Sequence, residues 1–291
     1  MNRRTFLGTI SAAAILGRTL AWSKDEHRIP TIGLQLYTVR DVLDKDFDGT
    51  LASVASIGYR EVELGDSVKK PIQEVRDALK RHGLVAPSTH VPYKTMAESW
   101  PKVLDDAHFL GLRYVVVPWI DDEVRNQPDG WKRAAEAFNR AGEASKKAGI
   151  QFAFHNHWPE FVRTADGKIP YDILLAECDP SLVKMQMDLC WITVGGQDPV
   201  TYFQRYPGRF PMVHVKDLKK IPDVSTVQGG RFAGADMAEL TEVGSGVIDW
   251  KRIFSHAQEA GVRHFFVEHD NPKMPIESIR ASYNYLDHLR F

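Results

Sequence analysis

The sequence predicts a single α/β domain folded as a (β/α)8 barrel (a TIM barrel), for three reasons. Five segments share one pattern, in which an amphipathic stretch is followed by a glycine and then by a short β-branched or apolar run. The pattern recurs at intervals of roughly 25–40 residues, as expected for helix–strand units of a parallel sheet. No linker, low-complexity run or change of composition interrupts the chain after residue 30, so we expect one domain over residues 30–291.

A glycine separates the helical part of each repeated unit from its strand part. The five glycines are Gly58, Gly83, Gly111, Gly149 and Gly261. A glycine just past the end of a helix adopts the left-handed conformation that ends the helix at little cost. The apolar run after it is then expected to be a buried strand of a parallel sheet.

Eight strands and eight helices are predicted in alternation. The strands lie near residues 32–38, 59–64, 84–90, 112–118, 150–156, 183–189, 210–216 and 262–269. The helices lie near residues 47–57, 71–82, 98–110, 130–148, 171–178, 198–206, 249–260 and 276–289. Eight such units fit a closed barrel better than an open doubly wound sheet. An open sheet would be expected to carry a glycine-rich phosphate-binding turn after its first strand, and residues 33–37 form no such turn.

The first 21 residues predict an export signal that is not part of the barrel. Arg3 and Arg4 precede a mildly apolar run that extends to about Gly17, and Ala21 offers a small residue for cleavage. This arrangement is typical of a signal peptide, and the paired arginines resemble the signal of the twin-arginine pathway. We therefore expect the twin-arginine translocation machinery as a partner and the periplasm as the location. The simpler alternative is a basic tail without a targeting role.

Charge and composition limit the partners of the mature protein. The chain has 37 Lys and Arg against 38 Asp and Glu, and residues 1–21 contain three arginines and no acid, so 34 against 38 leaves a net charge of −4. That balance argues against nucleic acid, whose phosphates need a clear excess of Lys and Arg. No segment has the ~20 consecutive apolar residues that span a bilayer, so no membrane span is expected in the mature protein. A small uncharged molecule is the expected partner.

The two cysteines exclude a zinc-ribbon cluster and permit at most one disulfide. Cys178 is expected on a helix and Cys190 at the end of a strand. We expect two buried free thiols, with a disulfide as the alternative in an oxidising compartment.

Polar residues at the carboxyl ends of the predicted strands are the candidate site residues, because that end of such a barrel carries the active site. Alternate residues of a strand share a face. In residues 212–216 two valines suit the outward face, which leaves His214 and Lys216 pointing into the barrel. The same alternation directs Glu268 and Asp270 inward. The candidates are Gln35, Glu61, Glu63, His90, His155, His157, Gln186, Asp188, His214, Lys216, Glu268 and Asp270.

Three of the candidates, Asp188, His214 and Glu268, together suit a metal ion. Buried carboxylates are costly unless they are paired or bound to metal. A mixed oxygen and nitrogen donor set accepts Mn²⁺, Co²⁺, Zn²⁺ or Mg²⁺, and the spacing does not distinguish among them. A single such residue at a strand end is more often structural, so it is their convergence that predicts one divalent metal ion.

Five segments resemble the sugar phosphate isomerase/epimerase family, which belongs to the xylose isomerase-like barrel superfamily. They are residues 32–41 (IGLQLYTVRD), 154–161 (FHNHWPEF), 187–189 (MDL), 213–217 (VHVKD) and 266–268 (FVE). The likeness extends from about residue 30 to the C-terminus. It implies a barrel with one divalent metal ion, held by Asp188, His214, Glu268 and a residue of the fifth strand.

The resemblance is incomplete at two positions. Epimerases of the superfamily end the fifth strand on a Glu, where this chain has His155. Glu160 is the expected substitute ligand, and His157 is the alternative. Three residues after the strand-six Asp, the sugar epimerases carry a substrate-binding His, where this chain has Trp191, a residue able to stack on a pyranose face.

The site and the resemblance together predict a metal-dependent sugar isomerase or epimerase that removes a proton next to a carbonyl. Glu268 or Glu160 is the expected base, with Lys216 and His157 as further catalytic groups. Substrate contacts are expected from Gln35, Glu63, His90, His155 and Trp191. The export signal favours a neutral sugar, keto-sugar or glycoside, because phosphorylated sugars are largely cytoplasmic.

Three alternatives compete with this prediction. With a leaving group β to the carbonyl, the same site would be a lyase or dehydratase acting on a 3-keto-glycoside. A non-catalytic sugar-binding barrel is the second, and an endonuclease acting at abasic DNA is the third. Such endonucleases use three zinc ions with more ligands, and the acidic chain argues against one. Residues 218–248 are long for a loop, which favours a lid or a substrate-recognition loop over a surface excursion.

Overall fold

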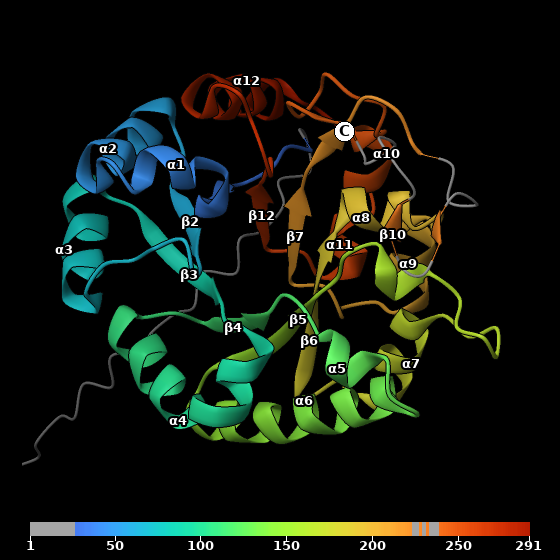
Figure 1. Cartoon of the computed structure of the whole chain (residues 1–291). Coiled ribbons are helices and arrows are strands. Elements are labelled where there is room, and N and C mark those ends of the chain that lie inside the picture. Colours follow the sequence, from blue (N-terminus) through green and yellow to red (C-terminus); the bar gives the residue numbers. More distant parts are fainter. Residues whose placement is uncertain (1–26, 223–226, 229–230, 233–238) are drawn as a thin grey trace, which may run out of the picture.

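The computed structural model describes residues 27–222, 227–228, 231–232 and 239–291, and the predicted export signal lies outside them. Eight parallel strands form a closed barrel in the order β1-β12-β7-β6-β5-β4-β3-β2. Helices surround the strands on the outside (Figure 1). The predicted (β/α)8 barrel is therefore confirmed.

Each barrel strand lies inside its predicted run. The strands are β1 (Ile32–Gln35), β2 (Glu61–Leu64), β3 (Val85–His90), β4 (Tyr114–Val117), β5 (Gln151–His155), β6 (Val183–Asp188), β7 (Met212–Val215) and β12 (His264–Val267). The first strand ends earlier than predicted, because the chain turns into the 3-10 helix η1 (Leu36–Val39). Gln35 caps this turn, since its Oε1 accepts a hydrogen bond from the amide of Tyr37 at 3.1 Å.

The helices include the eight predicted ones, with two differences, and four further short helices after β1, β4, β5 and β6. They are α1 (Arg40–Leu43), α2 (Phe47–Ile57), α3 (Ile72–His82), α4 (Tyr93–Leu110), α5 (Asp122–Arg125), α6 (Gly130–Lys147), η2 (Pro159–Phe161), α7 (Pro170–Glu177), α8 (Leu189–Val194), α9 (Pro199–Arg205), α10 (Trp250–Phe254), α11 (Ala257–Ala260) and α12 (Pro275–His288). The helix predicted at residues 98–110 begins earlier and is kinked at Ser99, next to Pro101, which lacks an amide donor and crowds the preceding turn. The helix predicted at residues 249–260 is two short helices.

Alternation along the strands divides the core into two parts. Outward side chains, among them Val213, Val215, Phe265 and Val267, pack against the helices in the main hydrophobic core. A small apolar cluster inside the barrel consists of Tyr114, Val116, Ala153, Met212 and Phe266. The predicted outward faces of β7 and β12 are therefore confirmed, and the polar residues of these strands point into the barrel.

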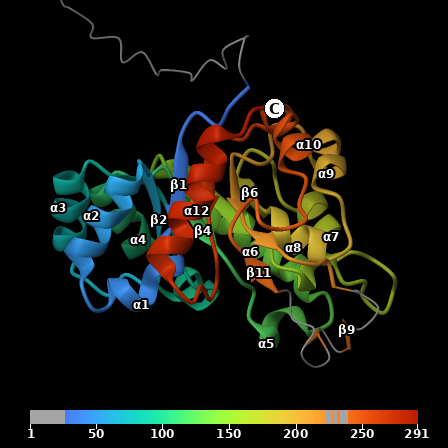
Figure 2. The same cartoon turned by 90° about the horizontal axis from the view of Figure 1, so that it is seen from above.

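The predicted lid, residues 218–248, is described only in part, because residues 223–226, 229–230 and 233–238 lie outside the described residues. Its pairings are β8 (Asp217–Leu218) with β11 (Leu240–Thr241), and β9 (Val227–Gln228) with β10 (Arg231–Phe232). The buried Asp217 carboxylate accepts hydrogen bonds from the Gly244 amide (2.9 Å) and from Trp250 Nε1 (3.0 Å), which anchors the returning chain. Figure 2 shows β9 and α5 at the end of the barrel opposite the C-terminus.

The two cysteines are free and buried, as predicted. Burial raises the pKa of the Cys178 thiol to about 12, so this thiol stays protonated and unreactive at neutral pH. Among the described residues, no helix combines the length and the apolar character needed to cross a bilayer.

Candidate active site and metal centre

A cavity of about 770 Å³ opens at the carboxyl ends of the strands. Predicted site residues line its floor, and they are Gln35, His90, His155, His157, Glu268 and Asp270. Its outer wall comes from loops and short helices, with the residues Tyr37, Arg40, Asp41, Asp44, Asp66, Lys69, Trp119 and Asn271. The sequence patterns missed these outer residues, because loops have no periodicity that marks a side chain as facing a cavity.

Glu63 of β2 is fully buried and organises the polar interior of the barrel. Five groups surround its carboxylate, and they are Gln35 Nε2 (2.8 Å), Ser88 Oγ (2.6 Å), Gln186 Nε2 (2.7 Å), His214 Nε2 (2.6 Å) and His90 Nε2 (3.1 Å). Burial disfavours the charge, but His90 and His214 outweigh burial and hold the pKa of Glu63 far below its usual value. Because donors of the protein already occupy this carboxylate, Glu63 is better suited to orienting its neighbours than to the predicted contact with substrate.

His214 of β7 bridges two carboxylates. Its Nδ1 lies 2.7 Å from Glu268 Oε2, and its Nε2 lies 2.6 Å from Glu63 Oε2. Ionised carboxylates only accept hydrogen bonds, so both ring nitrogens carry protons and the ring is an imidazolium. Burial works against this charge, but Glu268 and Glu63 outweigh burial and raise the pKa of His214 to about 10.

Lys216, two residues further along the chain, is buried, and its ammonium lies among three carboxylates. Its Nζ is 3.2 Å from Asp188 Oδ2, 2.9 Å from Glu268 Oε2 and 2.8 Å from Asp270 Oδ1. Burial disfavours the ammonium, but Asp188, Asp270 and Glu268 outweigh burial and raise the pKa of Lys216 well above its usual value. The ammonium is therefore a charged donor next to Glu268 and Asp270, both of which line the cavity.

The site holds more negative than positive charge. We define the acid cluster as the carboxyl groups of Glu63, Asp188, Glu268 and Asp270. The ammonium of Lys216 and the imidazolium of His214 lie against it, and His90 adds a third positive charge next to Glu63 when its ring is protonated. Asp188 Oδ1 accepts hydrogen bonds from two amides of α8, whereas Oδ2 accepts no hydrogen bond from the described residues and faces the Lys216 ammonium at 3.2 Å. Burial raises the pKa of Asp188 in spite of both cations. The donor atoms of Asp188, His214 and Glu268 lie within 4.8 Å of one another, so the residues fit a divalent cation in charge and in donor type.

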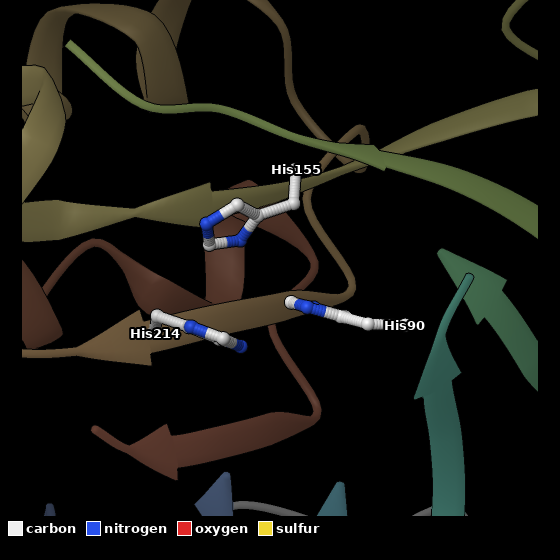
Figure 3. Close-up of side chains that lie close together, drawn as sticks. All are labelled: His90, His155 and His214. Atoms are coloured by element: carbon white, nitrogen blue, oxygen red, sulfur yellow. The ribbon is translucent and has the colours of Figure 1, made fainter. Parts of the chain in front are cut away.

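The side chains of His90, His155 and His214 converge from three strands into a second group of possible ligands (Figure 3). The ring centroids of His155 and His214 are 4.5 Å apart, and His90 stacks on His214 at 5.3 Å. His155 Nε2 also lies 4.0 Å from Asp188 Oδ2. Burial and the neighbouring His214 lower the pKa of His155 well below its usual value, which keeps this ring in the neutral form that binds metals.

Two predicted residues lie apart from these groups. Glu160 is fully buried in η2, where its Oε2 accepts a hydrogen bond from the His157 amide at 2.8 Å, and it belongs to neither donor group. Trp191 is buried with its ring 5.0 Å from Lys216 Nζ, and it is not part of the cavity wall. Glu160 as a ligand and Trp191 as a stacking surface therefore stay predictions, which this arrangement does not add to. Glu160 lies in the turn after β5, and Trp191 is buried in the first turn of α8.

His157 lies at the cavity, yet its Nδ1 is buried without a hydrogen-bond partner among the described residues. Burial, helped by the nearby charge of Lys216, lowers the pKa of His157 to about 3. The ring is therefore neutral at physiological pH and open to an interaction with a ligand.

The Glu160→Gln variant is expected to be more stable than the wild type at pH 8, by ~3 kcal/mol. Burial raises the pKa of Glu160 from 4.5 to about 7. A raised carboxyl pKa means that ionisation destabilises the fold. The free-energy cost of ionising Glu160 in the folded wild type is absent below pH 4.5, grows as the pH rises, and is complete above pH 7. The extra stability of the Gln variant should therefore vanish near pH 4.5. Urea unfolding at both pH values in the presence of a chelator measures the difference in unfolding free energy between variant and wild type. The exposed Glu177→Gln variant is the control. A variant less stable than wild type at pH 8 would contradict the prediction.

The chain is similar to several known proteins. A family model described as xylose isomerase-like TIM barrel matches residues 51–289. Inosose dehydratase from Lacticaseibacillus casei is 25% identical to the chain, over 92% of this chain and 94% of its own length. Inosose dehydratase from Clostridium perfringens is 23% identical, over 81% and 82%.

Solved structures give a similar picture. A sugar phosphate isomerase/epimerase from Parabacteroides distasonis has a TM-score of 0.73 and 27% identity, covering 92% of this chain and 96% of that chain. An IolI protein with a zinc atom has a TM-score of 0.65 at 14% identity, covering 87% and 95%, which is a likeness of fold alone.

Proposed function

Because the chain belongs to the xylose isomerase-like TIM barrel family, we propose that it is a carbon–oxygen lyase acting on a ring that carries a ketone. The observation that carries the proposal is the pair of Glu268, which lines the cavity, and Lys216, which is buried behind it, with the ammonium 2.9 Å from the carboxylate. An elimination needs such a pair, one group to take a proton and one to give a proton to the leaving group. The relatives named inosose dehydratase support this reaction type.

We propose that one divalent metal ion, Mn²⁺, Co²⁺, Zn²⁺ or Mg²⁺, binds to Asp188, His214 and Glu268, with His155 as the residue of β5 best placed to join them. A metal ion at such a site acts as a Lewis acid that polarises the carbonyl group and stabilises negative charge on its oxygen. The uncompensated charge of the acid cluster supports a divalent rather than a monovalent cation. His214 would bind as the neutral ring, after loss of a proton.

The protein's own residues would carry the proton transfers. Glu268 takes the proton from the carbon next to the carbonyl, and the resulting electron pair forms the new carbon–carbon double bond as the β carbon–oxygen bond breaks. The departing oxygen takes a proton from the Lys216 ammonium and leaves as water or as an alcohol. The product is an unsaturated ketone, and the two side chains regain their charges when the proton returns from Glu268 to Lys216, directly or through water.

Isomerisation or epimerisation is the second candidate, because it begins with the same proton abstraction. The likeness to the sugar phosphate isomerase/epimerase from Parabacteroides distasonis favours it. In that case the proton returns to carbon and no bond to oxygen breaks. A sugar-binding barrel without activity is the third candidate. Binding alone would not require an acid–base pair such as Glu268 and Lys216.

We further propose that the substrate is a neutral keto-sugar or glycoside and that the protein is exported by the twin-arginine machinery to the periplasm. The paired residues Arg3 and Arg4 support export, and the acidic balance of the chain after residue 21 supports an uncharged partner.

Incubation of the metal-loaded protein with keto-sugars and 3-keto-glycosides in D₂O tests the proposed function. We expect loss of the group β to the carbonyl and an unsaturated ketone, both visible by NMR and mass spectrometry. Deuterium at the α carbon with the leaving group retained would replace the lyase by an isomerase or epimerase. Neither deuterium uptake nor elimination with any of these compounds would rule out both.

A further inference from the structure

Building on the proposed function, we propose that the cavity holds a second ring of the substrate beside the reacting ring. The substrate would then be an uncharged two-ring glycoside rather than a free monosaccharide or a sugar phosphate. We name the place of the second ring the outer subsite, formed by Tyr37, Arg40, Asp41, Asp44, Asp66, Lys69, Trp119 and Asn271.

The cavity is too large for one sugar ring. Its volume is about 770 Å³. A hexose has about twelve non-hydrogen atoms, and even at the ~30 Å³ that a whole water molecule occupies in the liquid, it would fill less than half of that space. Small-molecule sites generally bury most of the surface of their ligand. A single ring over the acid cluster would leave the outer part of the cavity to water, whereas two linked rings would fill it.

Tyr37 provides an aromatic surface that is held in place. The guanidinium of Arg40 lies 4.0 Å from its ring centroid, and Tyr37 as a residue is 44% exposed. Arg40 is itself fixed, since it donates hydrogen bonds to the Asp270 carbonyl (2.5 Å) and to Asn271 Oδ1 (2.6 Å). An aromatic ring fixed before binding loses little conformational entropy when an apolar sugar face packs on it.

Trp119 provides a second such surface. The guanidinium of Arg125 lies 4.2 Å from its ring, and His157, which also lines the cavity, meets it edge-on at 5.3 Å. Trp119 follows β4 and Tyr37 follows β1, and these strands are three places apart in the barrel. The two aromatic rings therefore approach the cavity from different sides of its mouth, as a ring held between them would require.

The charges of the outer subsite favour an uncharged ligand. Lys69 Nζ is paired with Asp44 Oδ2 at 3.1 Å, and Arg40 Nε lies 4.0 Å from Asp41 Oδ1. Asp66 adds another carboxyl group, and burial raises its pKa. A phosphate group needs uncommitted cations, whereas carboxylates that still accept hydrogen bonds suit sugar hydroxyl groups. The subsite thus disfavours a sugar phosphate.

Isothermal titration of the wild-type protein with unreactive sugars tests whether the cavity binds a second sugar ring. We expect cellobiose or maltose to bind at least tenfold more tightly than methyl glucoside, and glucose 6-phosphate to bind no better than glucose. Equal affinities for one and two rings would overturn the proposal, as would no measurable binding of either disaccharide. Tighter binding of the phosphate would overturn the assignment of an uncharged ligand.

Variants locate the second ring. Tyr37→Ala and Trp119→Ala are expected to lower the affinity for the disaccharide about tenfold and to leave that for methyl glucoside unchanged. Phe109→Ala is the matched control, because Phe109 is also exposed with a guanidinium, that of Arg76, at 4.0 Å, yet lies outside this cavity. If Trp119→Ala does not fold, Trp119→Phe should fold and keep the preference for two rings. Loss of affinity for both sugars alike would contradict the outer subsite.

The proposal of an outer subsite and the proposal of a lyase can be contradicted independently of each other. If the protein reacts with no keto-sugar but still prefers two rings through Tyr37 and Trp119, the lyase is wrong and the subsite stands. If 3-keto-glucose derivatives with one and two rings react with equal KM, the subsite is wrong and the lyase stands.

Discussion

Replacement of Glu268 by Gln is expected to lower the rate of proton exchange at the carbon next to the carbonyl by ~10²–10⁴-fold. Glu268 is a carboxylate of the acid cluster that lines the cavity and lies 2.9 Å from the Lys216 ammonium. Burial opposes its ionisation, but Lys216 and His214 outweigh burial and hold the pKa of Glu268 well below its usual value, so the group is ionised at neutral pH. Glutamine has nearly the same shape and cannot take up a proton. Deuterium uptake from D₂O, followed by NMR, measures the loss.

The control for this variant is Glu277→Gln, at an exposed position of α12. It should exchange at the wild-type rate, and circular dichroism should show that both variants are folded. Exchange by Glu268→Gln at the wild-type rate would mean that another group is the base. His157 would then be the first residue to substitute, because it lies at the cavity in its neutral form.

Replacement of Lys216 by Met is expected to destabilise the metal-free protein by about 3–5 kcal/mol, the usual cost of removing one partner from a buried ion pair. The carboxyl groups of Asp188, Glu268 and Asp270 would lose the ammonium that lies within 3.2 Å of each of them. A divalent metal ion should restore much of the loss, because it supplies positive charge to the same carboxylates and binds only the folded chain. Thermal unfolding with a chelator, and then with Zn²⁺, Mn²⁺, Co²⁺ or Mg²⁺, measures both effects.

Lys102→Met is the matched control. Lys102 pairs with Asp106 at 2.6 Å, but its side chain is 75% exposed, and an exposed pair of this kind contributes at most about 1 kcal/mol. The metal ion should leave its stability unchanged relative to the wild type. If the metal raises the melting temperature of Lys216→Met no more than that of the wild type, the acid cluster is not the metal site.

The inward residues of β7 and β12 could be predicted because side-chain direction along a strand is a local property. Val213 and Val215 mark the outward face by their apolar character, and His214 must then point the other way. Closure of the barrel brings β12 beside β7, with Phe266 opposite His214 in the register. His214 and Glu268 thereby come within 2.7 Å, although 54 residues separate them.

The positions of Glu160 and Trp191 show where local patterns no longer give the direction of a side chain. Both follow the end of a strand, where the chain leaves the alternation and its direction depends on how the turn packs. Glu160 lies in a 3-10 turn. Trp191 lies in α8, which begins directly after β6 because Asp188 caps it, with Oδ1 accepting from the amides of Cys190 and Trp191 at 2.9 and 2.8 Å. Position in the sequence alone could not distinguish these directions from ones that face the metal ligands.

The barrel, its eight strands and the identity of the inward polar residues follow from hydrophobic periodicity and from the glycines that end helices, and both are properties of neighbouring residues. The partners of those polar residues depend on contacts between distant parts of the chain. Lys216 meets three carboxylates from β6 and the end of β12, and Glu63 gathers donors from four other strands. The outer subsite likewise brings Tyr37 and Trp119 to one cavity. Such contacts arise only when the sheet closes, because closure sets which strand ends face one another.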